Sequence, residues 1–295
     1  MDAILDAQGY TQGSVGERMA ALAREPRFLF ANDDQGRTAL LAYLRELVAQ
    51  VERRLPAYFA DLPRQRVDVR RVPAFNEAGA PGGYYDPPGL ASERPGIYWI
   101  NLRDMTAWPR FGLKTLTYHE TLPGHHLQVA LALGLPDLPL LRRLAPFNAY
   151  VEGWALYAER LAWEIGLYDG DPFGNLGRLQ DELFRAVRLV VDTGMHAKRW
   201  SREQAIAYMH RVTGNHIDEV TREIERYMAW PGQALGYKLG MMKILELRER
   251  ARAALGDSFD LSAFHHEVLR AGAMPLPVLA QRIDAWIARQ NPVPE

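Results

Sequence analysis

The sequence predicts a mainly α-helical protein, a multi-helix bundle with one small β-sheet at about residues 67–101. Apolar residues recur at helical spacing through most of the 295 residues. Capping boxes at Ser14–Glu17 and Ser201–Gln204 mark two helix starts. Runs typical of strands occur only between residues 67 and 101. No repeat or linker divides the chain, so we expect a single domain over residues 1–295.

Composition is that of an ordinary globular protein, with 48% apolar and 24% charged residues. A formal net charge of −1 gives no reason to expect nucleic acid or an anionic membrane as a partner. We also expect no membrane-spanning segment and no signal peptide, and therefore a cytoplasmic location by default, although a longer parent protein could be exported. The chain has no cysteine, so any metal must be held by histidine and carboxylate.

The first third of the chain alternates between helical and extended patterns. We expect helices at about residues 14–24 and 36–59, strands at 67–72, 81–88 and 96–101, and a helix from Pro109, at its first helical position, to His119. The small sheet directly precedes a histidine-rich segment. Its edge could hold an extended peptide, or the sheet could simply cover the core.

Residues 118–128 (YHETLPGHHLQ) carry three of the eight histidines. Zinc hydrolases often place two histidine ligands on a helix at i and i+4, with a glutamate general base after the first. Here the i+4 position from His119 is Pro123, and the next candidates are His125 and His126. Pro123 lacks an N–H and Gly124 tolerates unusual backbone angles, so a widened or broken turn could bring His125 back towards His119.

On this interpretation His119 and His125 are metal ligands and Glu120 faces a water molecule at the metal. His126 would contact the substrate, or would hold one of the metal ligands in place without binding the metal itself. The alternative is that these histidines are ordinary surface or core residues and that the Pro-Gly pair only ends a helix. The apolar flank at residues 127–133 places the segment in the interior, where histidine and glutamate need partners.

A third protein ligand is expected on the next helix, at residues 148–161. Glu152 lies between apolar residues and is the best candidate. Glu159, seven residues later, lies on the same face and could orient a ligand. Zinc is the expected ion, and manganese or cobalt would suit the same ligands.

The remainder of the chain reads as helices at about residues 176–200, 201–212, 217–228, 229–255 (ended by Gly256), 260–271 and 275–289. Arg188, Asp192 and His196 form a polar stripe at i, i+4 and i+8, either an internal ladder of ion pairs or part of a site wall. Tyr237 follows several glycines, which suggests close approach of another backbone or a ligand. Its hydroxyl could stabilise an oxyanion, or its ring could be core packing.

Three motifs together resemble a large bacterial family known as domain of unknown function 885: residues 119–128, 152–155 and 231–238. Members of this family are usually about twice as long, so the chain resembles their C-terminal part. The family is also distantly similar to gluzincin peptidases of the thimet oligopeptidase type. That resemblance implies a zincin-like helical zinc peptidase and favours His125 over His126 as the second ligand.

We therefore expect a zinc-dependent hydrolase of peptide or related amide bonds, with one ion held by His119, His125 and Glu152. Glu120 would be the general base. Candidates for stabilising the oxyanion are Tyr237 and then His196 or His126. Residues expected to support the site or contact a peptide are His126, Gln128, Glu159 and Tyr98.

The main alternative is a non-catalytic module that binds a metal or a peptide without cleaving it. Its support is the absence of half of the usual family length, whereas an intact Glu120 argues against it. A metal-free helical scaffold is a third possibility. The sequence gives neither the peptide length nor the oligomeric state.

Overall fold

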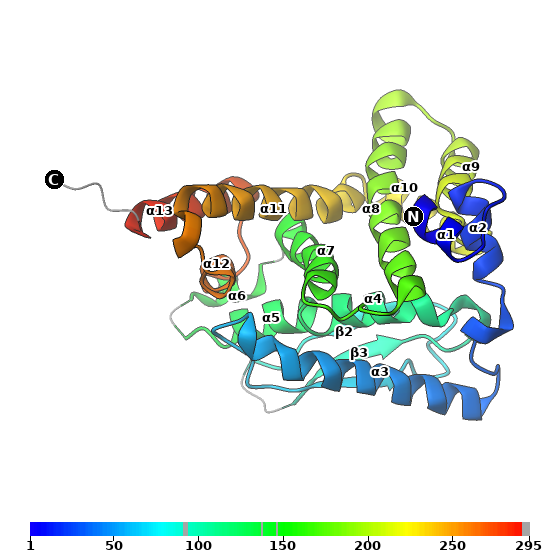
Figure 1. The fold of residues 1–295 in the computed structure, drawn as a ribbon, viewed down its shortest axis with the longest axis horizontal. Coiled ribbons are helices and arrows are strands. Elements are labelled where there is room, and N and C mark those ends of the chain that lie inside the picture. The colour runs from blue at the N-terminus through cyan, green and yellow to red at the C-terminus, as the bar shows by residue number, and fades with distance from the viewer. Residues whose placement is uncertain (91–93, 137, 146, 291–295) are drawn as a thin grey trace.

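The computed structural model describes residues 1–90, 94–136, 138–145 and 147–290. Within these ranges the protein is mainly helical, with one small three-stranded sheet, as the sequence predicts. Figure 1 shows the long helices crossing one another above the sheet, with α3 (Asp34–Arg54) running alongside it. The helix α3 packs on the sheet and on α4 (Arg110–Glu120), and its apolar side chains from Leu40 to Val51 join the largest core.

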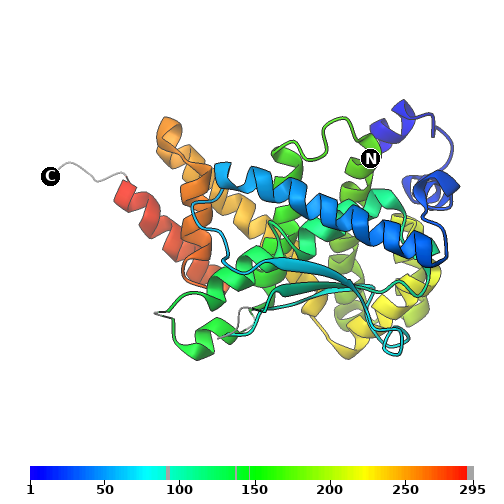
Figure 2. The ribbon, with the colours of Figure 1, turned by 90° about the horizontal axis from the view of Figure 1, so that it is seen from below.

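The sheet has the strand order β1 (Val67–Arg71), β3 (Gly96–Ile100), β2 (Gly83–Asp86). The pair β1 and β3 is parallel, with Val69 opposite Tyr98, and β2 is antiparallel to β3. This places β2 at an edge of the sheet. Figure 2, seen from below, shows the sheet and α3 side by side on this face of the molecule.

The candidate site draws on five helices. After α4 come α5 (His125–Leu133), α7 (Asn148–Glu164), α8 (Pro172–Lys198) and α11 (Gly236–Leu255). The helices α7 and α11 pack very closely, because a Cβ atom on Gly153 would lie 2.4 Å from the Cα of Gly240. The glycines at the start of α11 thus permit the approach of another backbone. The close crossing fixes α7, and with it Glu152, relative to Tyr237.

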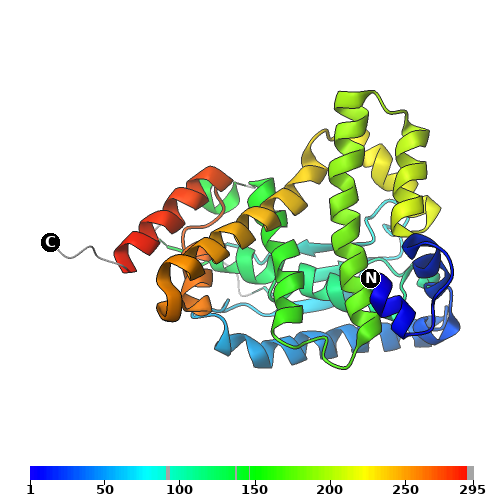
Figure 3. The same ribbon diagram turned by 45° about the horizontal axis from the view of Figure 1, so that its top comes forward.

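A second, smaller core lies where α8 packs against α9 (Arg202–Thr213) and α10 (Ile217–Ala229). Figure 3 shows α8 and α9 as an antiparallel pair that projects away from the sheet. At the C-terminal end of the chain, α12 (Leu261–Leu269) and α13 (Leu276–Gln290) pack beside α11. At the N-terminal end, a third hydrophobic core joins α1 (Asp2–Ala7) and α2 (Val15–Leu22) to Phe111 and Leu176.

Several boundaries differ from the sequence prediction for local reasons. Helix α3 ends at Arg54 and is followed by a short 3₁₀ turn at Leu55–Ala57, because Pro56 ends the regular helix. Helix α8 begins earlier than expected, at Pro172, where the Asp171 side chain accepts the Gly174 N–H. Pro109 caps α4 rather than occupying its first turn. The short helices α1 and α6 (Leu140–Leu144) were not expected.

Candidate metal centre

The segment between His119 and His125 is a sharp bend that separates α4 from α5. Helix α4 ends at Glu120, and α5 begins at His125. Within the bend the Leu122–Pro123 peptide is cis, and the N–H of Gly124 donates to the carbonyl of Tyr118 at 3.0 Å. A Cβ atom on Gly124 would lie 2.0 Å from the carbonyl oxygen of His119, so no other residue fits there without movement. The broken turn expected from the Pro-Gly pair is confirmed.

Helix α7 holds the bend from the other side. The fully buried indole of Trp154 donates its Nε1–H to the carbonyl of Pro123 at 2.9 Å. Glu152 lies on the same helix, two residues earlier. Consequently the helix that carries the carboxylate also positions the bend that carries the histidines.

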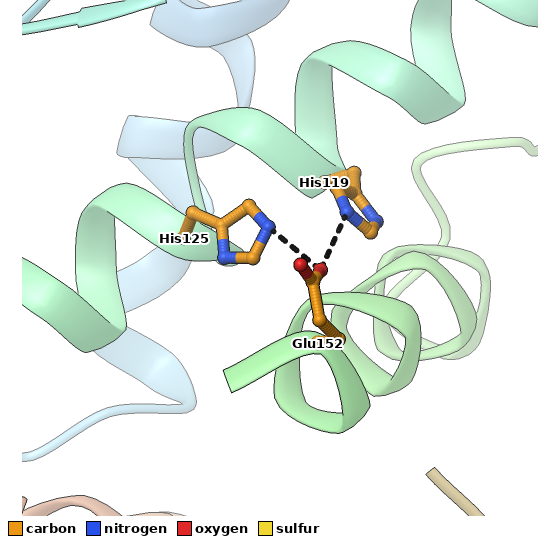
Figure 4. A group of neighbouring side chains, drawn as sticks. All are labelled: His119, His125 and Glu152. Carbon is orange, nitrogen blue, oxygen red and sulfur yellow. Dashed lines mark ion pairs between the residues drawn. The ribbon is translucent and has the colours of Figure 1, made fainter. Parts of the chain in front are cut away.

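The bend brings two imidazoles and one carboxylate together, as Figure 4 shows. The rings of His119 and His125 are 4.7 Å apart and nearly perpendicular. Oε2 of Glu152 lies 3.2 Å from Nε2 of His125 and 3.7 Å from Nε2 of His119. Ligand atoms from the three residues all lie within 4.8 Å of one another. This is the group of residues that the sequence analysis proposed as metal ligands.

The two distances from Glu152 to the imidazole nitrogens are close to those between ligand atoms of a tetrahedral metal ion. Ligand bonds of about 2.0–2.1 Å at tetrahedral angles put neighbouring ligand atoms roughly 3.3 Å apart. Oε2 of Glu152 is also buried, and it faces the Nε2 atoms of both histidines. A buried carboxylate oxygen beside two imidazole nitrogens is what a two-His, one-Glu zinc site presents before metal binds.

Glu159 supports the first of the histidines. It is fully buried on α7, and its Oε1 accepts the Nδ1–H of His119 at 2.7 Å. This bond leaves Nε2 of His119 facing Glu152, which is the nitrogen a metal would use. Nη2 of Arg185 lies 3.8 Å from the same Glu159 oxygen, so the guanidinium forms a long ion pair with this carboxylate.

Burial and neighbouring charges shift the pKa values of this group in opposing directions. Burial acts to lower the pKa of His119, but its hydrogen bonds to Glu152 and Glu159 outweigh that effect and raise the pKa to about 10. Burial acts to raise the pKa of Glu152, but His125 and His119 hold it well below its usual range. Burial raises the pKa of Glu159 despite Arg185 and His119. Without metal His119 therefore retains a proton that a bound cation would displace.

Glu120, the last residue of α4, is buried beside this cluster. Within the described residues its carboxylate has no hydrogen bond or ion pair, yet its charge is close enough to help raise the pKa of His119. Tyr98 of β3 is also fully buried, and its hydroxyl has no hydrogen-bond partner there. Burial, and then the charge of Glu120, raise the pKa of Tyr98 well above its usual value. The sheet thus meets the site through Tyr98.

Tyr237 at the start of α11 is placed against the same cluster. Its ring is nearly parallel to that of His119, with centroids 6.3 Å apart. Burial raises the pKa of Tyr237, and the charge of Glu152 acts in the same direction. The hydroxyl therefore stays protonated and can donate a hydrogen bond.

The structure separates the roles of the two adjacent histidines. His126 points away from Glu152, accepts the hydroxyl of Tyr85 at Nδ1 (2.9 Å) and donates Nε2–H to the carbonyl of Gln65 (2.9 Å). Burial lowers its pKa to about 4, so the ring is neutral. His126 thus ties β2 and the segment before β1 to α5, and it is His125 that reaches the cluster. Gln128 on α5 is buried, with its Oε1 unpaired in the described residues.

His196 does not reach the cluster. Its exposed side chain approaches the carbonyl of Tyr227 with Nε2 at 3.1 Å. It lies eight residues after Arg188, about 12 Å further along α8.

The polar stripe on α8 is not a ladder of ion pairs within the helix. Arg188 pairs with Glu223 on α10, and Asp192 accepts the N–H of Gly232 at 3.0 Å. Only the first residue of the stripe lies near the site, so His196 is removed as an oxyanion candidate.

The family model for a bacterial protein of unknown function, DUF885, matches residues 1–283. The chain belongs to the DUF885 family. A search of curated proteins found no match.

Two solved structures resemble this DUF885 chain. The crystal structure of the "putative lipoprotein from Colwellia psychrerythraea" is 58% identical, with a TM-score of 0.96 over 98% of this chain and 49% of that one. A "putative lipoprotein of unknown function from Shewanella oneidensis" is 22% identical, with a TM-score of 0.77 over 94% and 51%. The second shows likeness of fold alone. The chain spans about half the length of both.

Sequence reasoning missed two residues beside the site of this DUF885 chain. Arg185 reaches Glu159, and the guanidinium carbon of Arg188 lies 4.3 Å from the centre of the Tyr237 ring. The helical spacing on α8 predicts for Arg188 only a place in a polar stripe. Two arginines three apart within the otherwise apolar run at residues 184–191 were the available signal, because buried arginines need acceptors on neighbouring elements.

Proposed function

We propose that this chain is a zinc-dependent hydrolase of peptide or related amide bonds. The observation that carries the proposal is the convergence of His119, His125 and Glu152 around one point, with the unpaired carboxylate of Glu120 beside them. A zinc ion bound there would supply Lewis acidity and lower the pKa of a water molecule to about 7. A purely structural site is closed by its ligands and has no use for a free base.

The side chains around the cluster take the following roles. Glu120 accepts the proton of the attacking water and passes it to the leaving amine. Tyr237 donates its hydroxyl hydrogen to the oxygen of the attacked carbonyl. Glu159 fixes the tautomer of His119 through the bond to Nδ1. These roles need no movement of the elements, because α7 already holds the bend and the carboxylate together.

The sheet offers a place for an extended substrate. The strand β2 lies at the edge of the sheet, packs on α4, and carries no further strand in the part of the chain that the structure describes. An edge strand presents unpaired main-chain groups that can pair with a peptide backbone. A peptide along β2 would therefore bind through its backbone, with side-chain preference set by the neighbouring helices.

The cellular location is proposed here for a longer parent protein that would contain this chain. In the described residues no helix combines the length and the apolar character needed to cross a membrane. The 58%-identical relative is called a lipoprotein, which favours an exported parent protein over our cytoplasmic default.

The decisive experiment combines metal analysis with turnover. We expect the purified chain to bind one zinc ion per molecule and to cleave members of a peptide library. Glu120→Gln should keep its zinc and lose at least about a hundredfold in rate, because the ligands are unchanged and only the base is removed.

Two results would contradict the proposal. Full activity of the Glu120→Gln protein would remove Glu120 as the base. Zinc bound at the cluster, located by anomalous scattering, with no turnover by either protein would point to the non-catalytic metal-binding module instead. Glu249→Gln, at an exposed position on α11, is the control for the substitution itself.

A further inference from the structure

Two arginines on α8 lie behind the Tyr237 side chain. The guanidinium carbons of Arg188 and Arg185 are 4.3 Å and 5.9 Å from the centre of the Tyr237 ring. Each residue is more than nine-tenths buried, with 5% and 7% of its surface exposed. Charged groups at this depth are retained only where acceptors or counter-charges satisfy them.

The acceptors present do not satisfy Arg188. Its Nη2 donates to Glu223 at 2.9 Å, but the same carboxylate also binds Arg226 at 2.7 Å and the hydroxyl of Tyr227 at 2.7 Å. The Nε and Nη1 groups of Arg188 are buried without an acceptor. Among the described residues it is the only arginine with two such groups.

Arg185 is also incompletely bonded. Its Nη1 donates to Asp181 at 2.5 Å, whereas its Nε is buried and unpaired. Its Nη2 comes no closer to a carboxylate than the 3.8 Å that separates it from Glu159. In contrast, Arg178 on the same helix is equally buried and finds acceptors for Nε and Nη1 in Asn175 and Glu182. Unpaired buried donors of this kind need an explanation, and a bound ligand that supplies the missing acceptor is one.

We infer that Arg188, assisted by Arg185, forms a subsite for a carboxylate of the substrate. The ligand class is a short peptide with a free C-terminal carboxylate, and this inference rests on the proposed function. A guanidinium suits a carboxylate because its planar donors match the two oxygens. The aromatic rings of Phe184, Tyr227 and Tyr237 flank Arg188 within 5.4 Å and exclude water from that contact.

The position of Arg188 limits the length of the released fragment. The distances from the guanidinium carbon of Arg188 to the centre of the Tyr237 ring (4.3 Å) and from there to the centre of the His119 ring (6.3 Å), laid end to end, bound the separation of Arg188 from the His119 ring. An extended residue spans about 3.3–3.6 Å. A carbonyl at the cluster and a carboxylate at Arg188 are thus about three residues apart. The enzyme would release short C-terminal fragments.

The first test needs no variant. The zinc-loaded chain is given N-acetylated peptides of one sequence with either a free C-terminal acid or a C-terminal amide. We expect kcat/KM to be at least about tenfold higher for the acid, mainly through a lower KM. Equal rates for acid and amide would overturn the subsite while leaving the hydrolase proposal intact.

A matched pair of variants assigns the preference to Arg188. Arg188→Lys keeps the charge but loses the planar donors, so we expect the ratio of kcat/KM for the acid to that for the amide to fall at least about tenfold. Arg178→Lys, on the same helix, should leave the preference unchanged. An unaltered preference in Arg188→Lys would overturn the assignment.

Binding provides a readout that does not depend on turnover. Calorimetric titration of the chain with N-acetyl-Ala-Ala and with its C-terminal amide should show at least about tenfold tighter binding of the acid, lost in Arg188→Lys. If no peptide is cleaved, the proposed function fails, and this titration still decides the carboxylate subsite. Equal binding of the two ligands would overturn it.

Discussion

At the scale of single residues, the candidate site includes a carboxylate that would support the proposed metal ion without contacting it. Glu159 is fully buried and holds the Nδ1–H of His119 at 2.7 Å. Removing such a partner leaves the ligand in place but free to rotate or to change its protonated nitrogen. Glu152 and Glu159 lie on the same face of α7, so one helix supplies both the proposed ligand and the support for another.

The prediction is that Glu159→Gln weakens zinc binding by about 10- to 100-fold. A glutamine can still accept the hydrogen bond, but it removes the negative charge that stabilises a metal-bound imidazole. Competition with a fluorescent zinc chelator measures the change. Glu164→Gln is the control, because Glu164 is on the same helix but pairs with Arg248. An equal loss of zinc affinity in both variants would attribute the effect to α7 as a whole.

A second residue-scale prediction concerns Gly124. The Cβ of an alanine at this position would lie 2.0 Å from the carbonyl oxygen of His119, so the bend must open. We expect Gly124→Ala to lower the free energy of unfolding by about 1–3 kcal/mol and to weaken zinc binding, because His125 moves away from Glu152.

Gly112→Ala is the matched control for that change. Gly112 lies in α4, and nothing in the described structure is within 4 Å of the added Cβ. Alanine there should stabilise the helix by about 0.5–1 kcal/mol. Urea denaturation and zinc titration of both variants check the pair. A Gly124→Ala protein with normal stability and normal zinc affinity would show that the bend does not set the site.

At the scale of elements, a buried histidine joins three helical segments without any role in the site. His265 on α12 donates from Nδ1 to the carbonyl of Tyr58 at 2.8 Å and accepts the hydroxyl of Tyr157 of α7 at Nε2, also at 2.8 Å. It is wholly buried, and burial lowers its pKa to about 4. The neutral ring is therefore part of the native packing, and its protonation opposes folding.

This gives a prediction for stability against pH. Because the pKa of His265 falls from about 6.5 in the unfolded chain to about 4 in the folded protein, the unfolded chain binds the proton more tightly. The stabilisation is complete above pH 6.5 and is lost as the pH falls towards 4, by up to about 3 kcal/mol. Urea denaturation at several pH values measures the slope. His265→Gln should reduce it, whereas His266→Gln, at the neighbouring half-exposed position, should not.

The elements also show why prediction from sequence succeeded in part. Capping boxes and apolar periodicity are local signals, so α2 and α9 begin where Ser14 and Ser201 indicate. The helices α1 and α6 have six and five residues, too few for a clear period, and they form through contacts with other parts of the chain.

The candidate site was predictable for a related reason. His119, His125 and Glu152 follow from residue type and spacing, once the Pro-Gly pair is allowed to break the helix. The placement of His196 was wrong because a helical stripe shows which residues share a face and does not show which other elements cover it. Arg185 and Arg188 were missed for the same reason, since their partners lie on α7, α10 and α11.

At the scale of the whole molecule, the proposed metal ion would join α4, α5 and α7. These helices carry much of the largest core, which also includes Tyr118, Leu127 and Trp154. A ligand that binds only the folded chain raises its stability by an amount that grows with concentration, about 4 kcal/mol at a thousand times the dissociation constant.

The corresponding prediction is that removing zinc with a chelator lowers the melting temperature and that adding zinc restores it. Differential scanning fluorimetry with increasing zinc checks this. His119→Ala should abolish the zinc-dependent increase, and His266→Ala, half-exposed and far along the chain, should retain it. A melting temperature of the unaltered chain that does not change with zinc concentration would contradict the proposed metal centre.

The hydrogen bond from Trp154 to Pro123 has a consequence for how the candidate site forms during folding. Trp154 and Glu152 lie within one turn of α7, and the carbonyl that accepts the indole N–H belongs to the loop between His119 and His125. When α7 packs against the loop, it therefore brings the Glu152 carboxylate into the site and fixes the loop at Pro123 in the same step. A chain in which α7 has not packed against the loop would lack both the Glu152 ligand and the fixed pair of imidazole rings, so we expect such a chain to bind a metal ion only weakly.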